Sequence, residues 1–561
     1  MREYLLITLL IFIMLFPIPN FTGYSVKDEK NEIRLYLEGD TNSGEDNNTY
    51  ASVNVSFIES FVDKIEKTFW DAQYGGYFYS AKFGNIINYT KSLSVIARAM
   101  EAYSKLYNET KREEYKNKVY DLISLSEKFR HKPSNLYYGF LDRDFSPLST
   151  KNRLYDLYGN NSVISNIIFA NSLLTVYEIL KNDSILVLSK NICRSIYKEL
   201  WDQEYGGIYS LDANGNITKD IEVNAGFLVL NLKLYLLTNE REFLERAKAV
   251  LKIVDSMWYD GFFHSYDKKF NPINTMRYPP EKVIELPAYA YLLSYKIFGE
   301  EKHLIKSLRL INISLFYSWK VASGGTLLFL NQSYESTNEF MITSGSTLHY
   351  LSLIRDLIDN SLIKKYLRRR IAGYTKLLLS SFITPYGFPY KRGMFNKIKD
   401  YTIFAANQFY IAYSILLAKE ILKKDKNPPI FLYAYIEDDY MFIRVVDLES
   451  RVKGGVLIMN NSWYALLYFV NRNEYFFQYL DEYKGGDCII QFDDDSGNTL
   501  TLRINIESLP RRERGEEGGE KPAHDILSLL YYRFLLLYVL IIVLIFHIIF
   551  KSKVKVIERV S

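Results

Sequence analysis

The sequence predicts a mainly α-helical protein: a closed ring of helical hairpins, then a small β-sandwich, then a C-terminal transmembrane helix. Three observations lead to this prediction. A glycine-centred aromatic turn recurs along roughly the first 400 residues. Short alternating apolar runs follow residue 429, and an apolar stretch occupies residues 534 to 550.

The recurring turn is clearest at residues 70 to 80, WDAQYGGYFYS, and returns at residues 201 to 210 as WDQEYGGIYS. Weaker copies bring the turns to six, at intervals of roughly 54 to 68 residues, which is typical of a stacked supersecondary unit. Glycine permits the positive φ of a tight hairpin, and the flanking aromatic residues favour short strands. The turns are marked by Gly76, Gly139, Gly207, Gly261, Gly325 and Gly387.

Two kinds of helix alternate between these turns. Segments before a turn are charged and amphipathic, as in residues 111 to 128, which is typical of a helix facing solvent on one side. Segments after a turn are apolar nearly all round, as in residues 225 to 237, and need cover on every side. An open array would end on a polar face, yet the last helix, residues 402 to 421, is among the most apolar. The first repeat must therefore cover the last, which closes a ring of outer and inner helices.

With six helical hairpins and a WDxxYGG turn between outer and inner helix, residues 56 to 422 resemble the six-hairpin (α/α)6 toroid of many glycoside hydrolases and of the N-acylglucosamine 2-epimerase superfamily. The resemblance implies an (α/α)6 toroid over residues 54 to 425 and a protein that acts on or binds a carbohydrate. It does not specify the reaction, because one fold hosts many chemistries.

The N-terminal segment indicates export. Residues 1 to 24 combine Arg2, a short apolar run and two prolines, which fits either a signal peptide or a retained signal anchor. Residues 25 to 53 are polar and predict a flexible leader. Glycosylation sequons exceed what chance pairing would give; they begin at Asn20, Asn47, Asn54, Asn88, Asn108, Asn160, Asn182, Asn216, Asn312, Asn331 and Asn460.

The C-terminal part predicts a β-sandwich at residues 429 to 508, from about seven short strands separated by turn-forming residues. A charged linker follows at 509 to 524, and residues 526 to 550 are long and apolar enough to span a bilayer. Lysines in the tail at 551 to 561 place that end in the cytoplasm. We therefore expect a single-pass protein of the cell membrane, with the lipid bilayer as a partner and the large domain extracellular.

Composition and motifs also bear on which partners and cofactors to expect. A formal net charge of +4 in 561 residues gives no reason to expect nucleic-acid binding. The two cysteines, Cys193 and Cys488, do not form a disulfide framework. No phosphate loop, metal-ligand spacing or Ser/His/Asp signature appears, so we expect no cofactor and no metal.

In a helical ring of this kind, the first two turns of the inner helices face a central basin. Aligning the repeats by their apolar pattern gives a set of polar side chains at these positions. They are Lys91, Ser94, Asn161, Asn166, Glu222, Asn224, Glu281, Glu285, Glu339, Ser344 and Asn407. Asp71 and Asp202 recur with the turn itself, so we interpret them as hairpin-closing residues.

Glycoside hydrolysis needs two carboxylates, one of them with a raised pKa. Glu285 is the preferred candidate, because apolar neighbours in VIELPAYAY would raise the pKa of a carboxyl entering the basin. Alternatively, Glu285 has only a structural role, as a first-turn glutamate whose negative charge interacts favourably with the helix dipole. Glu222, Glu339 and Asp144 are the candidate partners, each of which could instead be a cap or a solvated charge.

Two histidines offer a different chemistry. Epimerases of the resembled superfamily use paired basin histidines to move a proton, and His264 and His349 could converge, although the surrounding epimerase motifs are missing and a core role is the alternative. A third hypothesis is a non-catalytic glycan-binding protein. Sugar contacts are expected from residues with rings or a guanidinium, with core packing as the alternative: Arg277, Trp258, Tyr138 and Tyr89.

Overall fold

The fold is described from a computed structural model. It covers residues 50 to 148, 153 to 273, 277, 280 to 320, 325 to 327, 330, 341 to 392, 398 to 423, 425 to 438, 440 to 459, 462 to 469, 473 to 478 and 487 to 512. The predicted signal segment, most of the leader, most of the charged linker, the transmembrane helix and the cytoplasmic tail lie outside these residues.

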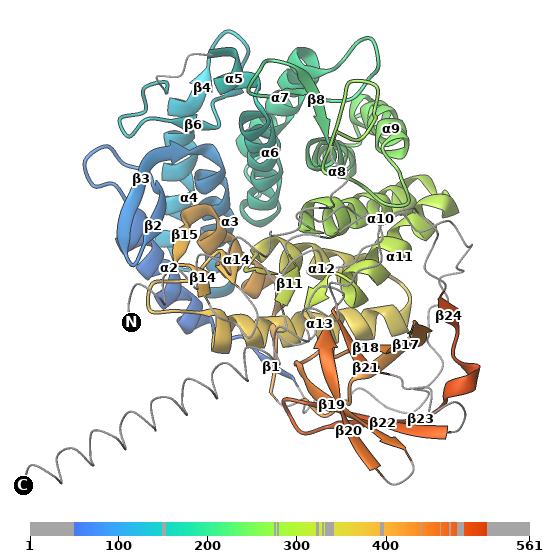
Figure 1. The fold of residues 1–561 in the computed structure, drawn as a ribbon. Helices are drawn as coiled ribbons and strands as arrows, with labels where there is room; N and C mark the ends of the chain where they lie inside the picture. Colours follow the sequence, from blue (N-terminus) through green and yellow to red (C-terminus); the bar gives the residue numbers. More distant parts are fainter. Residues whose placement is uncertain are drawn as a thin grey trace, which may run out of the picture. The chain divides into compact units, whose positions relative to one another are not determined.

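Twelve long helices of the described chain form two concentric layers (Figure 1). The outer layer is α2 (Val55–Phe69), α4 (Glu113–Ser126), α7 (Asp183–Leu200), α9 (Arg241–Ser256), α11 (Glu301–Phe316) and α13 (Ser361–Leu377). The inner layer is α3 (Leu93–Thr110), α6 (Asn160–Leu180), α8 (Ile221–Thr238), α10 (Leu286–Phe298), α12 (Gly345–Leu357) and α14 (Ala405–Ala418). The two helix types alternate as the sequence predicts.

The ring is closed. Each inner helix contacts the next, and α14 packs directly against α3. Strands also join the two ends: β1 (Tyr50–Ser52) pairs with β16 (Glu420–Leu422), and β15 (Thr402–Phe404) pairs with β2 (Phe78–Lys82). Residues 50 to 52 were expected in the flexible leader, and residues 402 to 404 and 420 to 422 in the last helix; instead they are the strands that complete the ring.

The burial of the helices explains their sequence patterns. In α2 the buried side chains are Ile58, Phe61, Val62, Ile65 and Phe69, a single stripe at helical spacing. The inner helices are buried on nearly all sides. Among the described residues, α6 and α8 are long and apolar enough to cross a membrane, but both are inner helices of the ring.

The glycine turns join each outer helix to the next inner one, and an aspartate shapes each of the two clearest copies. The Asp71 carboxylate accepts a hydrogen bond from the Gln73 amide at 3.1 Å, as expected for a hairpin-closing residue. It also forms an ion pair of 2.9 Å with Lys91, whose side chain is 1% exposed. Asp202 and Lys219 repeat this ion pair at 2.8 Å.

Inner-helix amides hold the backbone beside the turn glycines. Asn166 accepts from the Tyr137 amide at 2.8 Å and donates to the Tyr137 carbonyl at 2.7 Å. Asn224 makes the same two bonds to Ile208, at 2.9 and 3.0 Å. Lys91, Asn166 and Asn224 therefore serve the turns, and none of them lines the basin where the sequence alignment placed them.

Some sequons have a structural role in the described chain. In Asn54, Asn88 and Asn182 the side-chain oxygen accepts from the amide two residues later, at 3.0, 2.9 and 3.1 Å. Such Asx turns begin helices and tighten loops without any sugar.

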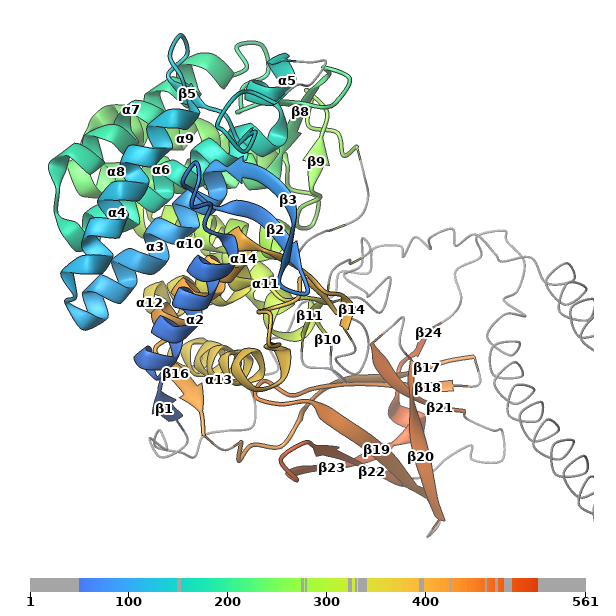
Figure 2. The ribbon, with the colours of Figure 1, turned by 90° about the vertical axis from the view of Figure 1, so that its left-hand side faces the viewer.

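The C-terminal region is β-rich (Figure 2). Its strand order is β23-β22-β19-β20-β21-β18-β17-β24. The bounds are β17 (Ile430–Glu437), β18 (Tyr440–Val446), β19 (Val452–Met459), β20 (Ser462–Phe469), β21 (Glu474–Gln478), β22 (Asp487–Asp494), β23 (Thr499–Asn505) and β24 (Arg511–Arg512). Both halves of this order contribute to one apolar core, separate from that of the ring. The strands hence form one continuous hydrogen-bonded series that folds over its own core.

Candidate functional site

A cavity lies inside the ring of inner helices. Its walls come from all six of them. One representative side chain from each helix in chain order is Arg98, Asn171, Glu222, Tyr289, His349 and Tyr410. The cavity therefore depends on closure of the ring, because distant repeats supply opposite walls.

Glu222 and Lys282 form an ion pair in this cavity. Glu222 is in the first turn of α8, and Lys282 is in the π-helix η3 (Glu281–Glu285) that precedes α10. The Lys282 ammonium lies 2.6 Å from the Glu222 carboxylate. Burial alone would lower the pKa of Lys282, but the nearby charge of Glu222 and the hydrogen bond to it raise that pKa above its ordinary value.

Glu281, next to Lys282 in the chain, is a second carboxyl group that lines the cavity. Its side chain is buried, and among the described residues its Oε2 atom has no hydrogen-bond partner. Burial, together with the charges of Glu285 and Glu222, raises the pKa of Glu281 to about 8. At neutral pH Glu281 therefore carries a proton, while Glu222 faces an ammonium group.

A second ion pair lies in the same cavity. The Arg98 guanidinium contacts the Glu101 carboxylate at 2.8 Å and stacks 3.5 Å above the centre of the Tyr410 ring. Glu101 also accepts a hydrogen bond of 2.8 Å from Ser172 of α6. This network ties α3 to α6 and α14 and makes the cavity floor polar.

His349 lines the same cavity from α12. The rings of Tyr350, Tyr410 and Tyr413 surround it, with centroids 5.0, 5.2 and 5.4 Å away. Burial, with the charges of Arg98 and Lys233, holds the pKa of His349 well below its usual range. Its Nδ1 atom has no hydrogen-bond partner within the described chain. The imidazole is therefore neutral.

Glu285 is not where the sequence analysis placed it. Its carboxylate accepts a hydrogen bond of 2.7 Å from Ser314 of the outer helix α11, and it is not among the residues that line the cavity. Burial raises the pKa of Glu285 to about 7. The expected effect of apolar neighbours is thus present, but the group faces the space between inner and outer helices.

The other two carboxylate candidates are not at the cavity. Asp144 is exposed in a turn after β6 (Phe140–Leu141), where it accepts hydrogen bonds from the Ser146 hydroxyl and amide at 2.6 and 2.9 Å. These bonds lower its pKa, as expected for a solvated turn residue. Glu339 lies outside the described residues.

His264 lies near the start of α8, apart from His349. Its Nδ1 atom is 2.8 Å from the Ser265 hydroxyl and 3.7 Å from the carboxylate of Asp220, the residue before α8. Burial lowers the pKa of His264, and the Asp220 charge only partly opposes this. His264 is not among the residues that line the cavity.

The predicted sugar-contacting residues pack elsewhere. The Arg277 guanidinium donates to the Phe262 and Tyr259 carbonyls at 3.0 and 2.9 Å. Trp258 packs edge-to-face on Phe262, Tyr138 on the His131 ring and Tyr89 on Phe78, at 5.2, 5.7 and 5.2 Å. None of the four lines the cavity of the described chain.

The sequence analysis missed three charged residues of the cavity. Glu101 and Lys233 lie beyond the first two turns of α3 and α8, which were the positions considered, and Arg98 in the second turn of α3 was overlooked. A signal was present, because a charge inside an otherwise apolar inner helix must find a partner in the interior. Glu281 was aligned to the basin but was passed over in favour of Glu285.

Comparisons with known proteins support the fold. The sequence matches no protein-family model, and no curated protein is similar to it. Among solved structures, the cellobiose 2-epimerase of Bacillus thermoamylovorans is similar with 12% identity and a TM-score of 0.50, over 64% of this chain and 99% of its own.

Two further structures are similar. A family 76 α-mannanase of Bacteroides thetaiotaomicron has 14% identity and a TM-score of 0.51, over 65% of this chain and 96% of its own. A D-mannose isomerase has 14% identity and a TM-score of 0.50, over 65% of this chain and 97% of its own. With its closed double ring of helices, the chain therefore has the six-hairpin (α/α)6 toroid fold that these glycosidases, epimerases and isomerases share.

Proposed function

We propose that the protein is a carbohydrate-active enzyme whose active site is the cavity inside the ring, and that it hydrolyses glycosidic bonds. One observation carries this proposal: two carboxyl groups on neighbouring inner elements line one cavity in different environments. Glu281 is buried and Glu222 is paired with Lys282. Carboxyl groups kept in different protonation states are what acid and base roles require.

In this mechanism Glu281 donates its proton to the glycosidic oxygen as the bond to the anomeric carbon breaks. Glu222 acts at the opposite side, either by taking a proton from the attacking water or by attacking the anomeric carbon itself. The two routes invert or retain the anomeric configuration, so the configuration of the product distinguishes them. Lys282 holds the Glu222 carboxylate in place.

The aromatic side chains of the cavity support a sugar as the ligand. Tyr289, Tyr350 and Tyr410 line it from three different inner helices. Aromatic rings pack on the apolar faces of sugars, while the hydroxyls of tyrosine and the amide of Asn171 offer hydrogen bonds.

We further propose that the enzyme works at the cell surface as a single-pass membrane protein, with the ring outside and the C-terminus in the cytoplasm. The apolar stretch at residues 526 to 550 and the lysines after it support this orientation. Protease treatment of intact cells tests it: the ring should be cleaved and the C-terminal tail protected. Protection of the ring would reject the orientation.

The catalytic proposal is tested on the full-length protein with a panel of oligosaccharides. Glu281→Gln and Glu222→Gln should each lower kcat by about 10²- to 10⁴-fold, the range for loss of a general acid or base. Asp144→Asn is the control, because Asp144 is an exposed turn residue that does not line the cavity. Full turnover by Glu281→Gln would reject its role, and binding without turnover across the panel would identify a non-catalytic glycan-binding protein.

A sugar epimerase is the second candidate, and His349 favours it. A neutral, buried imidazole with a free Nδ1 atom in the cavity could remove a proton from a sugar carbon. Incubation in D₂O tests this, because an epimerase of this type would place deuterium at the reacting carbon. His349→Ala should then abolish exchange, whereas hydrolysis without exchange would exclude this candidate.

A further inference from the structure

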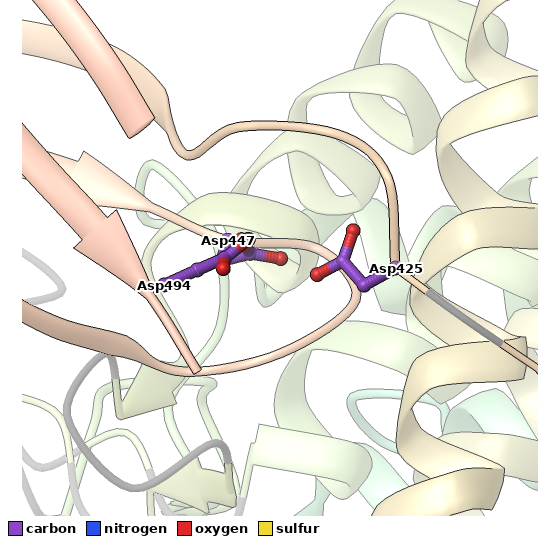
Figure 3. A group of neighbouring side chains, drawn as sticks. All are labelled: Asp425, Asp447 and Asp494. Carbon is purple, nitrogen blue, oxygen red and sulfur yellow. The ribbon is translucent and has the colours of Figure 1, made fainter. Parts of the chain in front are cut away.

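A cluster of buried acidic side chains lies outside the ring, where the chain passes into the β-rich region (Figure 3). Asp425 is in the linker between β16 and β17, Asp447 directly follows β18, and Asp494 is the last residue of β22. Carboxylate oxygens of the three residues lie within 4.8 Å of one another. Three separate segments therefore bring their carboxylates to one point.

The loops around the cluster hold the carboxylates in place. Asp447 Oδ1 accepts from the amides of Glu449 and Ser450 at 2.6 and 2.8 Å. Asp494 Oδ1 accepts from two amides of its own turn, both at 2.8 Å. Asp425 Oδ1 accepts from the Asn427 amide at 3.0 Å. Asn498 Nδ2 also donates to Asp494 Oδ2 at 2.6 Å, so each aspartate has at least one oxygen anchored to its loop.

The second oxygens of two of these aspartates point to a ligand. The Oδ2 atoms of Asp425 and Asp447 have no hydrogen-bond partner among the described residues, although both side chains are at most 1% exposed. In Figure 3 these two carboxylates point toward one another. A buried oxygen without a partner costs free energy unless a cation or a proton satisfies it.

The charges around the cluster do not balance. Glu449 is also buried here and is hydrogen-bonded by Asn427, so four carboxyl groups meet. In the described chain, the buried cations beside them are Arg369, paired with Glu449, and Arg370, which donates to the Asp447 main-chain carbonyl at 3.0 Å. With all four carboxyl groups ionised, these described residues carry two more negative than positive charges, and one divalent cation would neutralise the difference.

We propose that Asp425, Asp447 and Asp494 bind a divalent cation, calcium by preference, where the chain leaves the ring. Two oxygens bound to one Ca²⁺ at 2.3 to 2.6 Å can be at most about 5 Å apart, which the observed spacing satisfies. Carboxylates and backbone carbonyls are the hard oxygen ligands that calcium prefers, and Mg²⁺ usually retains several waters and uses only one or two carboxylates.

The site would stabilise the contact between the β-rich region and the outer helix α13. Arg369 and Arg370 both belong to α13. A Cβ atom added to Gly373 of the same helix would lie 2.7 Å from the Glu449 backbone, so helix and loop touch closely. A cation beside Glu449 would therefore hold this loop against the helix.

Calcium binding is measured on the full-length protein in detergent, stripped with EDTA and dialysed. Isothermal titration calorimetry should show one Ca²⁺ bound per chain, and Ca²⁺ should raise the unfolding temperature by several degrees over EDTA. Mg²⁺ should bind at least tenfold more weakly. No heat of binding, together with equal unfolding temperatures in Ca²⁺ and EDTA, would overturn the proposal, and equal affinity for Mg²⁺ would overturn the preference for calcium.

Variants locate the site. Asp425→Asn and Asp447→Asn should each weaken calcium binding at least tenfold. Asp495→Asn is the control, because Asp495 adjoins Asp494 but is paired with Arg451 at the surface. Calcium binding unchanged in both test variants would reject the assignment. If a variant fails to fold, the wild-type comparison of Ca²⁺ with EDTA still decides the proposal, since it needs no substitution.

Discussion

Acidic side chains are buried in two regions of this molecule, and the two regions neutralise them differently. In the ring, Asp71, Glu101 and Glu222 each pair with a cation at 2.6 to 2.9 Å. At the junction with the β-rich region, four carboxyl groups meet two arginines. These three acids of the ring are therefore satisfied by cations of the chain itself, whereas at the junction the carboxyl groups outnumber the cations beside them among the described residues.

The difference teaches how to separate structural from functional acids. A buried ion pair is costly to break, because removing one partner leaves an uncompensated charge. Burial raises the pKa of an acid that has no counter-charge. The pKa of Glu281 in the cavity is raised to about 8, and that of Asp425 at the junction to about 9. Such an imbalance is present at both places where we propose chemistry, and also at Glu285, which lies outside the cavity.

The largest loss of stability is expected at the ion pair of Asp71 and Lys91, in which each buried charge has a partner. Asp71→Asn should lower the free energy of unfolding by about 3 to 5 kcal/mol, because Lys91 would remain buried without its carboxylate. Denaturant unfolding measures this. Asp359→Asn is the control, since the Asp359 side chain is 84% exposed and its substitution should cost less than about 1 kcal/mol. A loss below 1 kcal/mol for Asp71→Asn would show that the buried ion pair contributes no more to stability than an exposed aspartate does.

At the junction, the effect of a substitution on stability should depend on whether calcium is present. At pH 7 in EDTA, Asp425→Asn should change stability by less than about 1 kcal/mol. Asparagine has the size and shape of aspartic acid, and its side-chain oxygen can still accept the hydrogen bond from the Asn427 amide. With calcium at 100 times its dissociation constant, the variant should lack about 2.7 kcal/mol of stabilisation that the wild type gains. If the stability difference between variant and wild type were the same in EDTA and in calcium, the junction would not differ from the ring in needing a bound cation.

The unpaired acid of the cavity should control the pH dependence of activity. The pKa of Glu281 is raised from 4.5 to about 8, so its protonated form is present below pH 8 and is lost as the pH rises. We expect kcat/KM to fall about tenfold per pH unit above 8, or about 1.4 kcal/mol per unit. A flat profile from pH 7 to 10 would argue against Glu281 as the acid.

The smallest effect is expected at the surface. Arg503 and Asp487 are 2.8 Å apart, as close as the buried pairs, but their side chains are 75% and 43% exposed. Arg503→Ala should change the free energy of unfolding by less than about 0.5 kcal/mol, because water and salt screen the pair. A loss comparable to that of Asp71→Asn would mean that burial is not what separates the two regions.

Much of the fold was predictable. The Gly76 and Gly207 turns, the alternation of helix types and the apolar last helix predicted a closed ring, which the packing of α14 against α3 confirms. These features are local: a turn needs positive φ at its glycines, and an inner helix needs apolar residues on all sides.

The site was only partly predictable. Glu222 was among the candidates and lines the cavity, but Glu285 and not Glu281 was preferred. Both lie in the same run of apolar residues, and the rotation of the helix within the ring decides which of them faces inward. An inner helix that is apolar on all sides carries no pattern that reveals this rotation.

The sequence by itself therefore determined the repeat, the two classes of helix and the strands of the C-terminal region, because each depends on residues close together in the chain. Only the tertiary structure decided which charges meet. Asp425, Asp447 and Asp494 are 22 and 47 residues apart, and they converge because strand pairing brings their loops together. Electrostatic partnership depends on distance in space, which a linear pattern of charges does not encode.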